Sequence, residues 1–273
     1  MSRGFYVVLQ AMALGVALGL AGCAGEAPEI RYVERPVEEL YNEALHQLDS
    51  ENYEDAGKLF DEVERQHPYS VWARRATLMS AYCYYQASKY DQTILATDRF
   101  IQLHPGNKDV AYAYYLRAVS LYEQIVDVGR DQRTTELALD ALNEVARRFP
   151  NSDYARDARL KIDLTRDHLA GKEMAIGRYY EKRGEYVAAI NRFRTVIEKY
   201  QTTSHTPEAL HRLVECYLAM GINKEAQTAA AVLGYNFPGS DWYLDSYALL
   251  EGQDLRPAED KGSWISQAWH SVF

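Results

Sequence analysis

Helical segments that end at spaced prolines constrain this chain more than any other feature. From Val37 to about Leu250 the apolar residues recur at helical spacing, with no sustained alternation of the kind a β-strand requires. Four of the prolines each follow an amphipathic segment (Pro68, Pro105, Pro150 and Pro238), and Pro207 follows Thr206 as the first helical residue follows its cap. The pattern therefore predicts an all-α protein built from repeated helices.

A 34-residue tetratricopeptide (TPR) template fits the chain in five registers. This template places small residues at positions 8 and 20, where the two helices of a hairpin cross, apolar residues at 24 and 27, and proline at 32. The pairs at positions 8 and 20 are Ala44 and Ala56, Ala81 and Thr93, Ala118 and Ala138, Gly177 and Ala189, and Val214 and Ala226. Gln201 replaces proline in the fourth unit. The alternative is five unrelated helical hairpins.

The sequence predicts a right-handed α-solenoid of five TPR hairpins over residues 36–250, with the first helix of each hairpin lining a concave groove. Two irregularities are expected. The third unit carries an eight-residue insertion around Asp127 to Thr134. The fourth begins with an extra charged stretch that has no helix breaker, which predicts one long helix from about Asp153 to Arg183.

The N-terminus is typical of a secretory signal peptide. Residues 1–22 carry one cation, Arg3, and an apolar stretch too short for a confident membrane span, and they end in Leu20-Ala21-Gly22-Cys23, which resembles a bacterial lipobox. The resemblance implies cleavage before Cys23, acylation of that cysteine and a polar tether over residues 23–35. Ala24 is not the aspartate of an inner-membrane retention signal, so we expect a lipid anchor on the periplasmic face of the outer membrane. The alternative is an ordinary signal peptide with a chance cysteine.

Composition and motifs disfavour several classes of function. Lys and Arg total 30 against 39 Asp and Glu, a net charge of −9, which disfavours nucleic-acid binding. Three cysteines cannot build a disulfide framework, and Cys83 and Cys216 are expected to be core thiols. The Glu-x-x-His pairs Glu64/His67 and Glu208/His211 lie in distant units, and Gln132 replaces the glycine that a calcium loop needs after Asp127. We expect no enzyme, no metal and no cofactor.

The predicted groove is aromatic in its first three units and charged in its last two. Positions 2, 5, 9 and 12 of the first helix of each hairpin share one face. They include Tyr41, Arg75, Tyr82, Tyr85, Tyr112 and Tyr115 in units one to three, and Arg178 in unit four. Tyrosines give an extended peptide stacking area and a hydroxyl, and Arg75 could bind a carboxylate. The alternative is that these tyrosines pack between neighbouring hairpins.

The tail over residues 251–273 is predicted to be a flexible spacer followed by a short amphipathic helix. Its apolar stripe consists of Trp264, Ile265, Ala268, Trp269 and Val272. Because so short a helix is not stable alone, it needs a surface. That surface is either the last repeat, which the helix would cap, or a partner or lipid surface, to which Trp264 and Trp269 would dock.

A lipobox followed by TPR units resembles the BamD family of the outer-membrane β-barrel assembly machine. The segments that carry the resemblance are RQHPYS at 65–70, DRFIQLHP at 98–105, FPNSDYARDA at 149–158, RYYEKRG at 178–184 and AAINR at 188–192. The family implies a non-catalytic periplasmic scaffold of the BAM complex. Its N-terminal units would bind the C-terminal signal of unfolded outer-membrane proteins.

The same resemblance implies that the C-terminal units dock a POTRA domain of BamA, with other BAM lipoproteins as further partners. Arg192 matches the family arginine tied to that coupling, and Arg178 joins it at the expected interface. The alternative is a TPR lipoprotein that coordinates peptidoglycan synthesis or envelope constriction.

Overall fold

The computed structural model describes residues 34–271, and the helices considered below lie in the unit Val37–Phe273. The predicted signal peptide, Cys23 and nearly all of the tether lie outside the described residues. Within 34–271 no helix is both long enough and apolar enough to cross a membrane.

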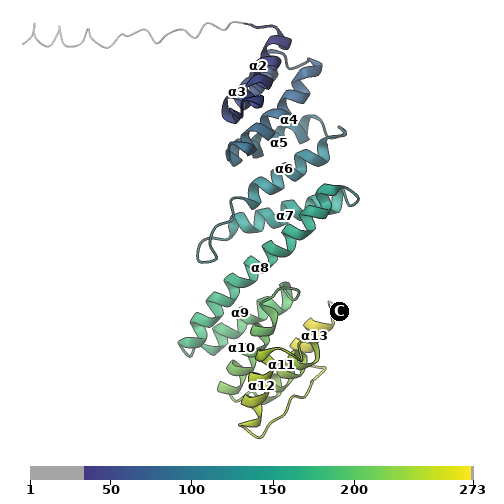
Figure 1. The fold of residues 1–273 in the computed structure, drawn as a ribbon. Coiled ribbons are helices and arrows are strands. Elements are labelled where there is room, and N and C mark those ends of the chain that lie inside the picture. The colour runs from purple at the N-terminus through teal and green to yellow at the C-terminus, as the bar shows by residue number, and fades with distance from the viewer. Residues whose placement is uncertain (1–33, 272–273) are drawn as a thin grey trace, which may run out of the picture. The chain divides into compact units, whose positions relative to one another are not determined.

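Helices and turns, without a strand, make up the described part of the chain, as predicted for an all-α protein (Figure 1). The helices are α2 (Val37–Asp49), α3 (Tyr53–Gln66), α4 (Val71–Gln86), α5 (Tyr90–Leu103), α6 (Val110–Tyr122), α7 (Arg133–Arg148), α8 (Asp153–Lys182), α9 (Tyr186–Lys199), α10 (Thr206–Ala219), α11 (Asn223–Asn236), α12 (Asp241–Glu251) and α13 (Trp264–His270).

Five helical hairpins follow one another in chain order, which confirms the TPR solenoid. Each first helix, here called an A helix (α2, α4, α6, α8 and α10), packs against the B helix that follows it (α3, α5, α7, α9 and α11). Each of the first four B helices also contacts the A helix of the next hairpin, and separate clusters of buried apolar residues follow one another along the stack. The insertion in the third unit forms the loop between α6 and α7.

The predicted small residues lie at the crossings between A and B helices. Ala44, Ala81, Ala118 and Val214 are fully buried. At the fourth crossing a Cβ atom on Gly177 would come within 2.4 Å of the Phe193 ring of α9. A larger side chain there would push α8 and α9 apart.

The starts of α8 and α10 compare differently with the predictions. α8 runs from Asp153 to Lys182 as one helix, as predicted, and Ser152 caps it by accepting a hydrogen bond from the Ala155 amide at 3.1 Å. At α10 the expected cap was wrong by one residue, because the helix begins at Thr206 and its N-cap residue is His205. The Thr206 hydroxyl instead donates to the Gln201 carbonyl at 2.9 Å.

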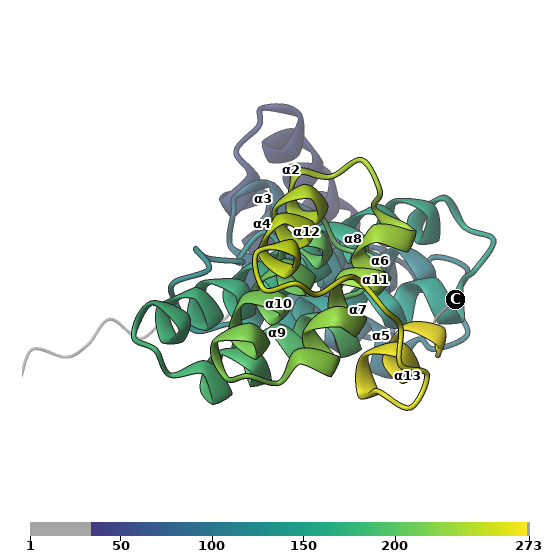
Figure 2. The ribbon, with the colours of Figure 1, turned by 90° about the horizontal axis from the view of Figure 1, so that it is seen from below.

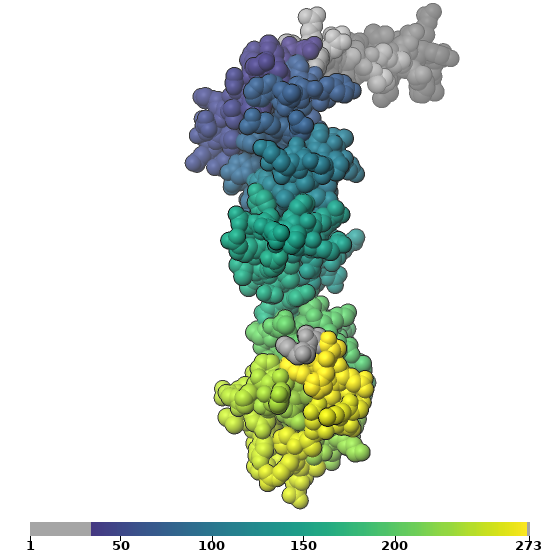
Figure 3. Space-filling model, turned by 90° about the vertical axis from the view of Figure 1, so that its right-hand side faces the viewer, coloured from purple at the N-terminus to yellow at the C-terminus, as the bar shows by residue number. Residues whose placement is uncertain are grey.

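The tail after the fifth hairpin departs most from the prediction. α12 takes the place of a sixth A helix and contacts α10 and α11. The segment 252–263, predicted to be a flexible spacer, is held along α11: the Ala258 amide donates to the Gln227 carbonyl, and the Asp260 amide donates to the Thr228 hydroxyl. In Figure 3 this C-terminal segment, in yellow, lies on the surface of the last hairpins.

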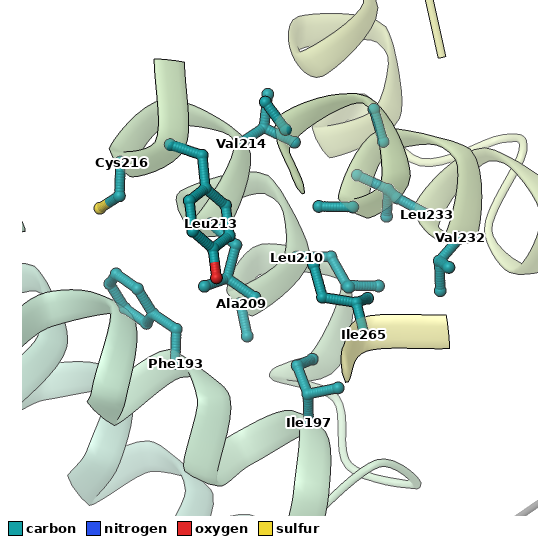
Figure 4. Close-up of a cluster of buried hydrophobic side chains, with 14 of the residues drawn as sticks. Phe193, Ile197, Ala209, Leu210, Leu213, Val214, Cys216, Val232, Leu233 and Ile265 are labelled. Carbon is teal, nitrogen blue, oxygen red and sulfur yellow. The ribbon is translucent and has the colours of Figure 1, made fainter. Parts of the chain in front are cut away.

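α13 packs against the chain's own last repeats, in contact with α9 and α11, so the prediction that its tryptophans dock to a partner was wrong. Ile265 is fully buried beside Ile197 of α9 and Leu210 of α10 (Figure 4). Trp269 is only 4% exposed, and its ring meets Phe237 edge to face. Trp264 donates its indole N–H to the Tyr217 hydroxyl at 2.9 Å. The helix is therefore a cap, the alternative that its apolar stripe left open.

Replacing Ile265 with alanine tests this cap. We expect the free energy of unfolding to fall by about 2 to 5 kcal/mol, because the change leaves a cavity in the core. Chemical denaturation of the purified chain measures this loss. Leu244→Ala on α12 is the matched control, since Leu244 is 60% exposed and its truncation should cost about 0.5 kcal/mol or less. Equal losses for the two variants would contradict a docked α13.

Candidate functional site: a tyrosine row and a cationic hollow

Four of the predicted groove tyrosines lie together across two A helices. Tyr82 and Tyr85 come from α4, Tyr112 and Tyr115 from α6, and each pair is three residues apart, so it shares one helix face. All four are half-buried around a small apolar cluster formed by Ala81, Ala96, Leu116 and Val119. The tyrosines thus do both things that the sequence left open: they join neighbouring hairpins, and each keeps part of its surface exposed. We call these four residues the tyrosine row.

The N-terminal half of α8 extends the row. Tyr154 stacks on Tyr115 with ring centroids 5.1 Å apart, and Tyr115 donates its hydroxyl to the Asp157 carboxylate at 2.7 Å. Burial raises the pKa of Tyr112 and of Tyr115, so both hydroxyls stay protonated at neutral pH. Partial burial opposes ionisation of Asp157, but hydrogen bonds from Tyr115 and Lys161 outweigh it and lower the pKa of the carboxyl.

Tyr154 and Asp157 are not among the groove residues predicted from the sequence. The TPR template has no position for the start of α8, because this stretch precedes the fourth unit. Their spacing of three residues on a helix was the available signal, since it places a ring and a carboxylate on one face.

Arg75 lines a hollow of about 940 Å³ at the N-terminal end of α4. Its cations are Arg74, Arg75 and Lys108, its one carboxylate is Asp109, and its remaining lining is Val71, Trp72, Leu78, Met79, Phe100 and Asn107. Arg75 and Leu78 precede Tyr82 on the same face of α4, so the hollow continues the tyrosine row. We call it the cationic hollow.

Tyr41 was predicted to line the groove with these residues, and the structure corrects that placement. It is only 5% exposed, its ring lies 4.7 Å from that of Trp72, and it meets Phe60 edge to face at 5.3 Å. Trp72, from the next hairpin, packs over it. Tyr41 therefore belongs to the core of the first hairpin.

The charged groove of units four and five is a closed network of ion pairs. Arg178 donates to both oxygens of Glu208 at 2.9 Å, and Arg212 binds Glu215 at 2.7 Å and approaches Glu181 at 3.7 Å. The pocket between them, about 290 Å³, is lined by Arg178, Glu181, Lys182, Tyr186, Arg212, Glu215 and Ala219. Arg178 is thus committed to a partner within the chain.

The two carboxyls of this network titrate in opposite directions. Burial, together with the nearby Glu215 charge, raises the pKa of Glu181 to about 7. Glu215 is also partly desolvated, but its contacts with His211 and Arg212 lower its pKa to about 2. Glu181 also accepts a hydrogen bond from the buried Cys216 thiol, whose pKa burial raises. Cys83 is likewise buried, with its pKa raised to about 12, so both thiols are core residues as expected.

Arg192 lies on α9, in a B helix as expected. Its guanidinium binds Glu173 of α8 at 3.2 Å, and its side chain remains 42% exposed. No group of three or more His, Cys, Asp or Glu residues in the described part of the chain could hold a metal ion.

The chain is similar to known proteins over most of its length. Residues 33–233 match the family model YfiO, described as an outer membrane lipoprotein. The chain is 58% identical over 245 residues to the outer membrane protein assembly factor BamD of Caulobacter vibrioides, covering 89% of this chain and 80% of that protein. It is 46% identical over 238 residues to BamD of Rickettsia prowazekii, covering 87% and 94%. A solved TPR protein of Thermus thermophilus is 19% identical, covering 79% of this chain and all of that one, with a TM-score of 0.36.

Replacing Glu181 with glutamine tests the charged network. A folded-state pKa raised above the unfolded value means that the contribution of Glu181 to stability falls as pH rises from about 4.5 through about 7. Glutamine resembles the protonated form of Glu181. The free energy of unfolding of Glu181→Gln, taken relative to that of the parent, should therefore be higher at pH 8 than at pH 5. Urea midpoints at both pH values measure this.

Glu185→Gln is the control for that experiment, because Glu185 is exposed and lies in the turn before α9. It should shift the midpoint equally at both pH values. A Glu181→Gln chain that loses more stability at pH 8 than at pH 5 would contradict the assignment.

Proposed function

This chain belongs to the YfiO family of outer membrane lipoproteins, as the BamD assembly factors of other bacteria indicate, and from that premise we propose how it works. It is an outer membrane protein assembly factor associated with the outer membrane. We propose that it is lipid-anchored through Cys23 on the periplasmic face. There it would recognise unfolded β-barrel proteins and couple them to a BamA-type insertase. The family does not favour the alternative in peptidoglycan synthesis or envelope constriction.

The observation that carries this proposal is the cationic hollow at the end of the tyrosine row. Arg74, Arg75 and Lys108 have no ion-pair partner within residues 34–271, although each contributes to one hollow. Three unpaired cations against one carboxylate favour an anionic ligand. The apolar lining beside them suits an aromatic side chain. A peptide that ends in an aromatic residue supplies both groups, because its terminal carboxylate lies next to the ring.

The tyrosine row would hold the part of the peptide that precedes this end. Tyr82, Tyr85, Tyr112 and Tyr115 offer partly exposed rings, which can pack on apolar side chains, and hydroxyls that can bond to an extended backbone. The Tyr115–Asp157 bond holds Tyr115 in place, so that side chain loses little entropy on binding. The role assigned is binding, with no catalytic step.

The partner end of the scaffold would lie around α8 and α9. The exposed face of Arg192 remains available to an acidic group of a POTRA domain, while Glu173 orients its guanidinium. Arg178 would act indirectly, by bracing α8 against α10 through Glu208. Other BAM lipoproteins would add to this assembly.

Peptide binding tests the groove. A ten-residue peptide ending in phenylalanine with a free carboxylate should bind the purified chain, and Tyr82→Ala with Tyr115→Ala should weaken binding by about 1 to 3 kcal/mol. Arg75→Glu should weaken binding of the peptide with a free carboxylate more than binding of its C-terminally amidated form. Isothermal titration measures both effects.

Two control variants accompany it. Tyr235→Ala, at an 87% exposed tyrosine of α11, and Arg256→Glu, in the tail, should leave affinity unchanged. If Arg75→Glu weakened both peptide forms equally, the carboxylate assignment would be wrong.

Depletion in the cell tests the function and the anchor. Loss of the protein should reduce folded β-barrels in the outer membrane, and the parent gene should restore them.

Cys23→Ala should leave the chain outside the outer-membrane fraction, because it removes the thiol that would carry the acyl chains. Fractionation and heat-modifiability of a major barrel measure these outcomes. Unchanged fractionation of the Cys23→Ala chain would rule out the anchor.

A further inference from the structure

α12 is the A helix of an unfinished sixth hairpin. It follows α11 as each A helix follows the B helix before it, and it contacts α10 and α11. No helix within residues 34–271 packs on it as its own B helix, because the chain next runs along α11 and α13 lies against α9 and α11. Figure 2 views the stack from this end, with α12 foremost and α13 apart from it.

Positions 4 and 8 of an A helix face the B helix of the same hairpin. In the third hairpin Tyr114, at position 4, meets Phe149 at the end of α7, with ring centroids 5.4 Å apart. In the fourth hairpin Gly177, at position 8, lies under an aromatic ring of α9, and Glu173, at position 4, binds Arg192 of that helix. Both positions are buried in the other hairpins and in the third: Leu40 and Ala44, Thr77 and Ala81, Tyr114 and Ala118, and Leu210 and Val214.

The same face of α12 is open. Its position 4 is Leu244, which is 60% exposed, and its position 8 is Ala248, which is also exposed. Leu249, next to Ala248, is 40% exposed. The outer face of a terminal repeat is ordinarily polar, because it meets water. An apolar stripe at the positions that a B helix buries therefore indicates a face that another helix covers.

We propose that α12 receives a helix of a partner protein, which completes the sixth hairpin in the place of a B helix. The chain's own B helices show which side chains this face accepts. In three of them a fully buried alanine is followed four residues later by Phe or Leu and three residues after that by Val: Ala56, Phe60 and Val63; Ala138, Leu142 and Val145; Ala189, Phe193 and Val196. The first hairpin is the nearest precedent, because its position 8 is also alanine, and Ala44 shares one core cluster with Phe60. The partner's large side chain therefore lies over Ala248, with Leu244 beside it.

Charge adds a preference at one end of the partner helix. Asp241 and Asp245 lie one turn apart on α12, are exposed, and have no ion-pair partner within residues 34–271. Two cations that contact α12 are engaged: Arg256 binds Glu251 at 3.6 Å, and Arg212, which lies over a ring of α12, is held by the glutamates of the charged network. Because the two helices of a hairpin are antiparallel, the partner carries Lys or Arg in its C-terminal half.

A second copy of this chain is a poorer occupant. Its five B helices are each packed in a hairpin of their own, and its α13 is buried against α9 and α11. The α12 of a second copy would bring two sets of Asp241 and Asp245 together, and like charges oppose such a contact. A separate helix with basic residues fits the face better.

Two peptides copied from the chain serve as probes, because both contain the alanine, phenylalanine and valine spacing. Residues 186–199, the α9 peptide, carry three cations and one carboxylate. Residues 53–66, the α3 peptide, carry two cations and five carboxylates. We expect the α9 peptide to bind the full chain, about tenfold more tightly than the α3 peptide does. Fluorescence anisotropy measures both affinities.

Variants of the chain and of the peptide locate the contact. Leu244→Arg should weaken binding of the α9 peptide about tenfold, because it puts a charged side chain where the apolar anchor packs. Phe193→Ala within the peptide should weaken binding as much. Asp245→Asn should reduce the preference for the α9 peptide over the α3 peptide. Leu95→Arg on α5 is the matched control, since Leu95 is 63% exposed and is not part of α12, and it should leave binding unchanged.

Thermal melts should show that every variant of the chain folds. Binding of the α9 peptide that Leu244→Arg does not weaken would place the peptide elsewhere on the chain and overturn the proposal. Absence of binding, or tighter binding of the α3 peptide, would overturn it as well. Dimers of the chain in sedimentation that are lost with Leu244→Arg would assign this face to a second copy instead.

Discussion

The close crossing of A and B helices is the constraint on which the rest of the structure depends. At the fourth crossing Phe193 lies over Gly177 where no Cβ atom fits, and at the joint between the first two hairpins the Tyr84 ring lies 2.9 Å from the place of a Cβ on Gly57. Because side-chain volume at these points sets the distance between helices, it also sets the spacing from one hairpin to the next. That spacing brings Tyr82 and Tyr112 from different helices onto one surface.

The sequence predicted those features that depend on local volume and breaks in the helical pattern. Small residues such as Ala118 and Ala138 gave the register, and the absence of a breaker after Asp153 gave the length of α8. It failed where an apolar face can be covered in more than one way. The helical pattern of Tyr41 fits both a groove position and a core position. Only the contact with Trp72 of the next hairpin shows that Tyr41 lies in the core. The sequence likewise does not show which residue packs against Trp269, because its partner Phe237 is distant in sequence.

Ion pairing distinguishes the charged groove of units four and five from the cationic hollow. In units four and five, Arg178 and Arg212 are bound by glutamates of neighbouring helices, so those charges hold the hairpins together. In units one to three, Arg75 and Lys108 lie in one hollow without such partners among the described residues. Arginines also hold hairpins together in the N-terminal units, where Arg117 binds Asp98 and Glu144, so it is the cations of the cationic hollow that remain free for a ligand.

α8 gives this division a mechanical consequence. Its 30 residues span about 45 Å without a break. Near its start Asp157 accepts the Tyr115 hydroxyl, and near its end Arg178 binds Glu208. An unbroken helix resists bending, since its own hydrogen bonds oppose a kink. The tyrosine row and α10 are therefore both held by one unbroken helix.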